Sequence, residues 1–159
     1  MADELPGNLT GKYLIRTGRW AFQEAHKWLP RTRDRAELRR HALKLRFWPG
    51  FAGEQTGGQV LDMDWSWVKS LPGKRIGELR IHDTLGGCDN LRVIFFVPPR
   101  VAIELPMIWI LSVFQKKRDD FTVPQRKNFE LRRTMILEQF YIDCHPGHEP
   151  GRPGKSAGC

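Results

Sequence analysis

The segment 108–114, with the sequence IWILSVF, constrains the fold of this chain more than any other. It contains no polar residue before Ser112. An uninterrupted apolar run of this length is typical of a strand that is covered on both faces of a sheet, so we predict that it is the central strand. Two more strands are predicted upstream, at 76–82 (IGELRIH) and at 91–97 (LRVIFFV), because both segments are short and rich in apolar residues.

Helices are predicted before and after these strands. The segments 19–29 and 32–45 carry apolar residues at helical spacing. Pro30 separates them, because the residue before a proline avoids helical geometry. The last helix is predicted at 122–141, where Thr122 begins a Thr-x-x-Gln capping box.

Together these elements predict an α+β fold: a small, twisted, mainly antiparallel sheet with two N-terminal helices, one C-terminal helix and a short additional strand at 12–17. The 159 residues suit a single domain, which we assign to 1–143, with a flexible segment at 1–11. The remainder, 144–159, is rich in proline and glycine and is predicted to be a disordered tail. Cys144 and the two histidines of this tail lack a nearby fourth ligand, so no metal site and no cofactor are expected.

The balance of charge indicates the class of partner. With 26 Lys and Arg against 18 Asp and Glu, the formal net charge is +8 at pH 7. This excess favours either a nucleic acid or an acidic protein as the partner. No apolar run approaches the roughly 18 residues of a membrane span, and the start of the chain lacks a signal-peptide core. The three cysteines are widely spaced, which suits a reduced compartment. We therefore expect a cytoplasmic protein without a membrane partner.

Polar residues interrupt the predicted strands on one face. Because side chains alternate across a strand, Glu78, Arg80 and His82 share one face of the segment 76–82. In the next strand, Arg92 is out of phase with its apolar neighbours. The sheet is therefore predicted to have one apolar face and one face with a cationic floor.

A basic turn follows the third strand. Its sequence, QKKRDD, brings Lys116, Lys117 and Arg118 together. Arginine is always charged and can bond two phosphate oxygens at once. We predict that Arg118 forms a phosphate clamp with Arg80 and Arg92, and that Lys116 or Lys117 either adds charge to it or protonates the leaving oxygen. Such a clamp stabilises the charge that develops on phosphorus when an RNA 2′-hydroxyl attacks it, and it requires no metal.

Two roles are open for the other polar residues on this face. Glu78 and His82 are candidates for the acid and base of proton transfer. Alternatively, Glu78 pairs with Arg80 or Arg92, and His82 only ends the strand.

The segment 60–70 (VLDMDWSWVKS) also alternates, with Trp65 and Trp67 on one side and Asp64 and Ser66 on the other. Tryptophans in this pattern either stack on bases or, more commonly, belong to a core or a partner groove.

Further basic residues are candidates for binding RNA or the ribosome. They are Arg35, Arg39 and Arg40 in the second predicted helix, and Arg126 and Lys127 in the last one. The alternative for the second helix is a solvated face, which is the usual role of a run of charges.

Three segments carry a likeness to a known family. GELRIHD at 77–83, NLRVIFF at 90–96 and SVFQKKRDDFTVPQ at 112–125, in this order and spacing, resemble the RelE/ParE superfamily, in particular its RelE/HigB-like branch. The likeness covers roughly 12–141. It implies a RelE-like fold and a toxin of a type II toxin–antitoxin pair that cleaves messenger RNA, in many members while the RNA is bound to the ribosome. It also implies a partner, a small helix-turn-helix antitoxin with an acidic neutralising surface.

The resemblance assigns roles to single residues. Arg92 corresponds to the strand arginine that contacts the scissile phosphate in the family. Lys117 and Arg118 correspond to the basic turn that completes the site, with Lys116 beside them. Arg80 matches the arginine of the family's ELR strand.

The chain departs from the family pattern at three positions. Ile76 and Glu78 stand where RelE itself has lysines, and Phe121 is the nearest aromatic residue where a tyrosine is expected. Phenylalanine has no hydroxyl, so the assignment of acid and base stays open.

Two other functions are compatible with the sequence. One is a ParE-like protein that inhibits DNA gyrase and cleaves nothing, although such an inhibitor has no need of a phosphate clamp. The other is a catalytically degenerate family member that binds RNA or its antitoxin without activity.

Overall fold

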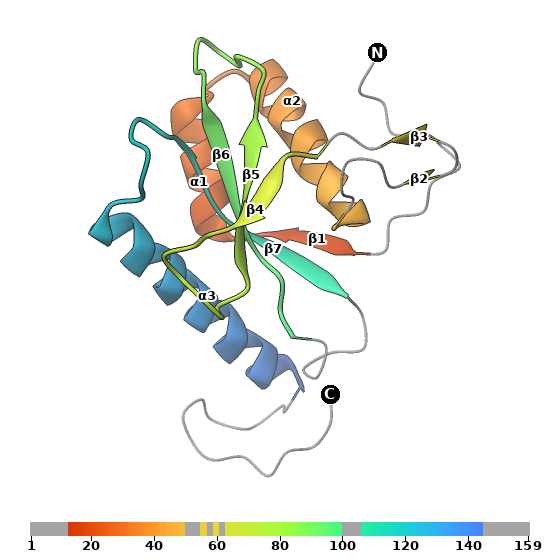
Figure 1. Ribbon diagram of the computed structural model, residues 1–159, viewed down its shortest axis with the longest axis vertical. Helices are drawn as coiled ribbons and strands as arrows, with labels where there is room; N and C mark the ends of the chain where they lie inside the picture. The colour runs from red at the N-terminus through yellow and green to blue at the C-terminus, as the bar shows by residue number, and fades with distance from the viewer. Residues whose placement is uncertain (1–12, 50–54, 57–58, 61–62, 100–105, 145–159) are drawn as a thin grey trace.

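The computed structural model describes residues 13–49, 55–56, 59–60, 63–99 and 106–144. Within these ranges the chain is α+β, with three α-helices and a five-stranded mixed sheet (Figure 1). In chain order the elements are β1 (Leu14–Thr17), α1 (Arg19–Trp28), α2 (Thr32–Leu43), the 3-10 turn η1 (Lys44–Phe47), β2 (Gln55–Thr56), β3 (Gln59–Val60), β4 (Trp65–Trp67), β5 (Ile76–Ile81), β6 (Leu91–Phe96), β7 (Met107–Gln115) and α3 (Val123–Cys144).

The predicted strands and helices are present, with small changes of boundary. Of the alternating segment 60–70, three residues form β4, whereas Val60 lies in the separate β2–β3 hairpin. Helix α3 continues to Cys144, three residues past its predicted end at 141 and one residue past the predicted end of the domain at 143. The predictions for 1–11 and 145–159 lie outside the described residues.

The order of strands in the sheet is β1-β7-β6-β5-β4. Strands β4, β5, β6 and β7 pair antiparallel, and β1 is parallel to β7. The prediction that 108–114 is the central strand is therefore wrong, because β6 is in the middle and β7 is second from the edge. An apolar run indicates burial on both faces of a strand, but it does not indicate how many strands lie on each side. Only the short edge strand β1 lies on one side of β7, whereas β6, β5 and β4 lie on the other.

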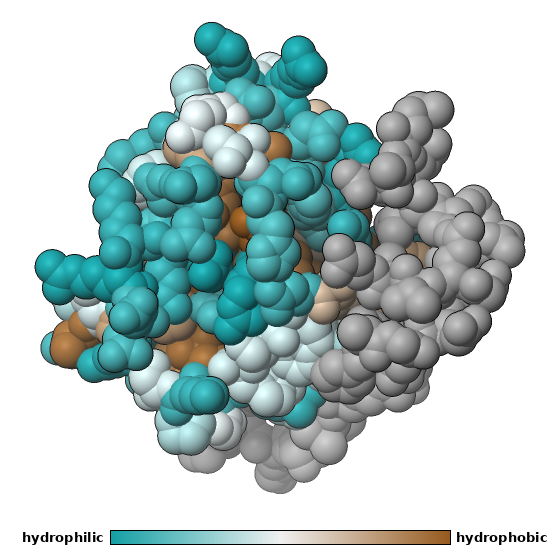
Figure 2. Space-filling view, turned by 45° about the horizontal axis from the view of Figure 1, so that its top comes forward, coloured by the Kyte–Doolittle hydropathy of each residue, from teal (hydrophilic) through white to brown (hydrophobic). Residues whose placement is uncertain are grey.

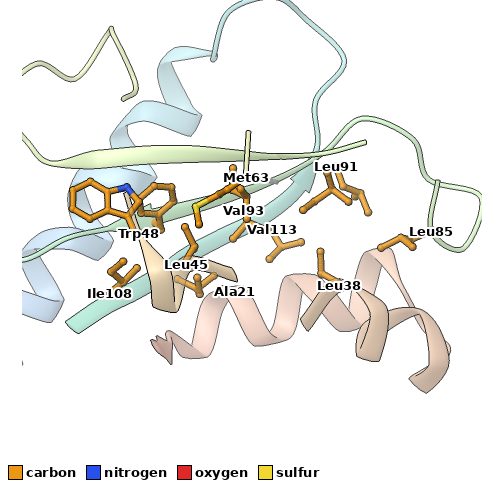
Figure 3. Packing of buried hydrophobic residues seen from close by; sticks show 14 of the residues in the cluster. Ala21, Leu38, Leu45, Trp48, Met63, Leu85, Leu91, Val93, Ile108 and Val113 are labelled. Carbon is orange, nitrogen blue, oxygen red and sulfur yellow. The ribbon is translucent and has the colours of Figure 1, made fainter. Parts of the chain in front are cut away.

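Two hydrophobic clusters occupy opposite faces of the sheet. On one face Ala21 of α1 and Leu38 of α2 pack toward Val93 and Val113 of the strands (Figure 3). On the other face Phe129 and Ile136 of α3 pack against side chains of β5, β6 and β7, namely Ile76, Ile94, Phe96, Leu111 and Phe114. The sheet is thus covered by α1 and α2 on one side and by α3 on the other.

The start of α3 confirms the capping box. The Thr122 amide donates to Oε1 of Gln125 at 2.8 Å, and the Gln125 amide donates to Oγ1 of Thr122 at 3.3 Å. These reciprocal bonds satisfy two of the amides that a helix start leaves without partners. They also fix the segment that leads from the basic turn into α3.

The loop between β5 and β6 turns at two consecutive glycines. Gly86 has φ 55° and Gly87 has φ 77°, in the left-handed region that glycine enters without the steric cost of a Cβ. Leu85 and Cys88 bridge across them. The tight turn returns the chain so that Arg92 of β6 lies directly opposite Arg80 of β5.

Candidate phosphate-binding site

The polar residues of β5 and β6 are neighbours on the α3 face of the sheet. Arg80 pairs with Arg92 across the two strands, and Arg92 pairs with Phe114 of β7. Ser66 of β4 is opposite Glu78. Residues directly opposite each other in antiparallel strands project on the same face, so three strands contribute side chains to one spot, as the alternation predicted.

Glu78 is at the centre of this cluster. The residue is only 5% exposed. Its Oε1 accepts a hydrogen bond from the Arg80 guanidinium at 2.8 Å. Its Oε2 is 3.8 Å from Lys116 Nζ and 4.0 Å from Arg92 Nε, but makes no hydrogen bond with the described residues. The alternative role for Glu78, pairing with Arg80 or Arg92, is therefore what the structure contains.

Arg80 is held by further acceptors from β4 and the residue before it. It donates to Oδ1 of Asp64 at 3.1 Å and to Oγ of Ser66 at 2.8 Å. The other carboxylate oxygen of Asp64 is 2.7 Å from Nε2 of His82. The His82 side chain is 71% exposed, so it lies at the solvent side of a chain of contacts that runs through Asp64 and Arg80 to Glu78.

The basic turn contributes Lys116 to the cluster. Lys116 follows β7 directly, its backbone amide donates to the carbonyl of Asn90 at 3.0 Å, and its ammonium lies 4.5 Å from the centre of the Phe121 ring. Lys117 and Arg118 are exposed, and neither makes an ion pair or hydrogen bond with another residue of the described ranges. The structure thus brings Lys116 to the cluster, but not Lys117 and Arg118.

A cleft of about 600 Å³ opens beside the cluster. Its lining comes from β4 and the turn after it, from β5, from the segment between β7 and α3, and from the first turn of α3. The lining residues are Ser66, Trp67, Val68, Lys69, Ser70, Glu78, Arg80, Lys116, Asp119, Asp120, Phe121 and Arg126. Arg92 is not among the lining residues, and its Nε is buried. A ligand in the cleft therefore meets Arg80, Lys116 and Glu78 first. The surface seen in Figure 2 is mostly hydrophilic, with small apolar patches.

The cluster holds more positive than negative charge. Three cations (Arg80, Arg92 and Lys116) contact two carboxylates (Glu78 and Asp64), which leaves one net positive charge. Burial lowers the pKa of Arg92 from its ordinary value; the Glu78 carboxylate opposes this, the Arg80 guanidinium adds to it, and Asp64 opposes it weakly. Arg92 is thus a partly desolvated cation whose charge is incompletely compensated.

The three basic candidates of α2 differ in their environment. Arg35 donates to the carbonyls of Leu29 and Pro30, at 2.9 and 2.7 Å, so it joins α1 to α2, which accounts for it without RNA. Arg40 pairs with Glu37, one turn earlier in α2, at 2.8 Å. The exposed Arg39 keeps the predicted surface position.

In α3 the two candidates also differ. Arg126 donates to the carbonyl of Phe121 at 2.9 Å and lines the cleft. Lys127 is exposed and does not line it.

Asp64, Ser66 and Phe121 belong to the site although the sequence did not assign them to it. The alternation of 60–70 placed Asp64 and Ser66 on one side of a strand, and this was the available signal. Phe121 stands where the family pattern has a tyrosine, and the sequence carries no signal of its contact with Lys116. The tryptophans of the same strand pack with Trp48, at 5.1 Å between the ring centres for Trp65 and 5.6 Å for Trp67. The core interpretation fits Trp65, which packs against the buried cluster, whereas Trp67 is 40% exposed and lines the cleft.

Among the described residues there is no group of three or more His, Cys, Asp and Glu side chains that could hold a metal ion. No helix in the described ranges is both long enough and apolar enough to cross a membrane. Comparisons with protein-family models, with curated proteins and with solved structures found no match to this chain.

Proposed function

We propose that the protein is an RNA-binding endoribonuclease that acts without a metal ion, and that the cleft beside Glu78 is its active site. The observation that carries this proposal is the meeting of Arg80, Arg92 and Lys116, from three separate segments, around one spot that borders an open cleft. A cluster with surplus positive charge is a site for an anion. The net charge of +8 for the whole chain favours a polyanion as the source of that anion.

The chemistry uses the nucleophile that RNA carries. The 2′-hydroxyl oxygen forms a bond to the adjacent phosphorus, and the bond from phosphorus to the 5′ oxygen of the next nucleotide breaks. The products are a 2′,3′-cyclic phosphate and a 5′-hydroxyl. Arg80 and Lys116, which line the cleft, stabilise the additional negative charge on the phosphoryl oxygens, and Arg92 adds its charge from the adjacent strand.

Two protons must move in this reaction. One leaves the 2′-hydroxyl, and one is added to the departing 5′ oxygen. Glu78 is the carboxylate among the lining residues that lies between the cations, and we assign it as the acceptor. Lys116, whose Nζ is 3.8 Å from Glu78, is assigned as the donor. His82 is held by Asp64 outside the lining of the cleft and is not assigned a step.

The biological setting follows from the sequence resemblance. We propose that the protein is the toxin of a toxin–antitoxin pair, that its substrate is messenger RNA, free or on the ribosome, and that an acidic antitoxin neutralises it. Expression alone should stop translation without DNA damage, whereas a gyrase inhibitor would cause DNA damage. Co-expression with an adjacent small gene product should restore growth.

The test of the enzymatic proposal is cleavage of a single-stranded RNA by the purified protein in EDTA. We expect fragments that end in a 2′,3′-cyclic phosphate and begin with a 5′-hydroxyl, and no cleavage of the 2′-O-methyl form. Lys116→Met should slow cleavage at least about a hundredfold, which is the usual effect of removing one charge-stabilising donor. Lys27→Met, at an exposed position of α1, removes the same charge and should cleave normally. Equal rates for both variants would sink the proposal.

A second candidate function is RNA binding without cleavage. It is favoured by the burial of Arg92 Nε and by the carboxylate of Glu78 among the cations, because both reduce the charge available to a transition state. RNA binding that depends on Lys116, in a protein that leaves the RNA intact, would establish this function instead.

A further inference from the structure

Glu78 is a buried carboxylate surrounded by three cations, Arg80, Arg92 and Lys116, that could otherwise bind an anionic ligand. Its side chain is 6% exposed, and Oε2 makes no hydrogen bond with the described residues although two cations lie within 4.0 Å of it. Buried charges in proteins are normally both paired and hydrogen-bonded. Oε2 of Glu78 and Nε of Arg92 therefore have hydrogen-bonding capacity that the described residues do not use.

The charge of the site without Glu78 would be different. With Glu78 the three cations and two carboxylates leave one net positive charge, and without it they would leave two. The remaining charged residues of the cleft, Lys69 and Arg126 against Asp119 and Asp120, cancel one another. Glu78 therefore decides whether the cleft matches a ligand with one negative charge or with two.

Resting on the proposed function, we propose that Glu78 is a specificity-determining residue that makes the cleft select the singly charged internal phosphodiester of RNA against doubly charged phosphate ends. An internal linkage carries one negative charge, so its binding leaves the site neutral. A terminal phosphate or inorganic phosphate carries close to two above pH 7. Its binding leaves an uncompensated negative charge beside a buried carboxylate, which the protein interior penalises.

Glu78 also holds in place the three cations that would bind the phosphate. Through Oε1 it holds Arg80, and through Oε2 it attracts Arg92 and Lys116, so three mutually repelling groups stay together before a ligand arrives. If Glu78 had a purely structural role, its removal would loosen the site and weaken the binding of every anion equally. The selectivity role predicts opposite changes for ligands of different charge.

The experiment is a competition at pH 8 with the full chain. A fluorescent 2′-O-methyl RNA oligonucleotide, which cannot be cleaved, is displaced either by diethyl phosphate, which has one negative charge, or by inorganic phosphate, which has close to two. The ratio of the two displacing concentrations is measured for each variant. In Glu78→Gln, inorganic phosphate should gain about tenfold over diethyl phosphate relative to the native chain.

Matched variants separate this effect from changes of overall charge and of folding. Glu138→Gln, at an exposed position of α3 about 18 Å along the helix from Arg126, alters the net charge equally and should leave the ratio unchanged. Glu78→Asp keeps the charge and should keep the native ratio. Glu78→Ser removes the charge in a smaller side chain and should shift the ratio as Glu78→Gln does, should the latter fail to fold.

The possible outcomes distinguish this inference from the function on which it rests. Oligonucleotide binding that needs Lys116, with an unchanged ratio in both neutral variants, overturns the role of Glu78 and leaves the proposed function standing. Absence of binding, or binding that ignores Lys116→Met, overturns both. A native chain that prefers inorganic phosphate about tenfold overturns the role of Glu78 even if no neutral variant folds.

Discussion

Glu24 and Glu78 each contact residues from several helices or strands. Comparing them distinguishes a structural ion pair, at Glu24, from the proposed binding site, at Glu78. Glu24 of α1 has one cation, Arg132 of α3, at 2.8 Å. The same Glu24 oxygen accepts from Oγ of Ser112 at 2.9 Å and from the Val113 amide at 3.4 Å, and Arg132 also donates to the carbonyl of Leu111. Charge and hydrogen bonds are balanced there, and the contacts tie α1, β7 and α3 together.

Glu78 has the opposite balance. It faces three cations, one of its oxygens makes no hydrogen bond with the described residues, and neither does Arg92 Nε. Stability alone does not account for such an arrangement, because like charges brought together repel and unbonded buried groups cost free energy. The comparison teaches that the Glu24 cluster serves the fold, whereas the Glu78 cluster, the proposed binding site, has a charge and bonding pattern that stability alone does not explain.

The largest effect, on stability, is expected at the Glu24 cluster. Arg132→Met should lower the free energy of unfolding by about 2–3 kcal/mol, because it removes a charged hydrogen bond and leaves the Glu24 carboxylate without its cation. Urea denaturation measures this change. Lys127→Met, on the exposed side of the same helix, should change the value by less than about 0.5 kcal/mol. Equal stability of the two variants would remove the structural role of Glu24 and Arg132.

A smaller effect, on RNA binding and not on stability, is expected at the Glu78 cluster. Arg92→Met should weaken binding of the uncleavable RNA about tenfold, or about 1.4 kcal/mol. The free energy of unfolding should change by less than about 1 kcal/mol, because the contact between Arg92 and Glu78 is 4.0 Å long and Glu78 keeps its hydrogen bond with Arg80. Fluorescence anisotropy and urea denaturation measure the two quantities. Arg92→Lys keeps the charge and should recover most of the affinity. A loss of stability as large as that of Arg132→Met would erase the contrast between the clusters.

The smallest effect is expected in the part of the basic turn that lies outside the cluster. Lys117→Met and Arg118→Met should each weaken RNA binding by no more than about twofold, because an exposed charge at a distance is screened by salt. The same anisotropy measurement decides this. A loss comparable to that of Arg92→Met would mean that the turn closes over the RNA and that all three of its cations contact phosphate.

The sequence was sufficient for the pattern along each strand and for the start of the last helix. Alternation placed Glu78 and Arg80 on one face and put Arg92 out of phase with the apolar residues of its strand. The capping box located the start of α3 because its bonds are local, between Thr122 and Gln125. Alternation did not single out Lys116 among the three cations of the turn, because that choice follows from the pairing of Phe114, two residues before Lys116, with Arg92.

Long-range pairing was decided only by the tertiary structure. The parallel edge strand β1, the middle position of β6 and the approach of Asp64 to Arg80 all depend on contacts between distant segments. The burial of Glu78 does as well, because strand periodicity gives the face of a residue but not what covers it. The sequence by itself therefore determined which residues are polar and on which face they lie. The fold determined which of them meet and how many cations surround one carboxylate, since electrostatic contacts depend on distance in space and not on separation along the chain.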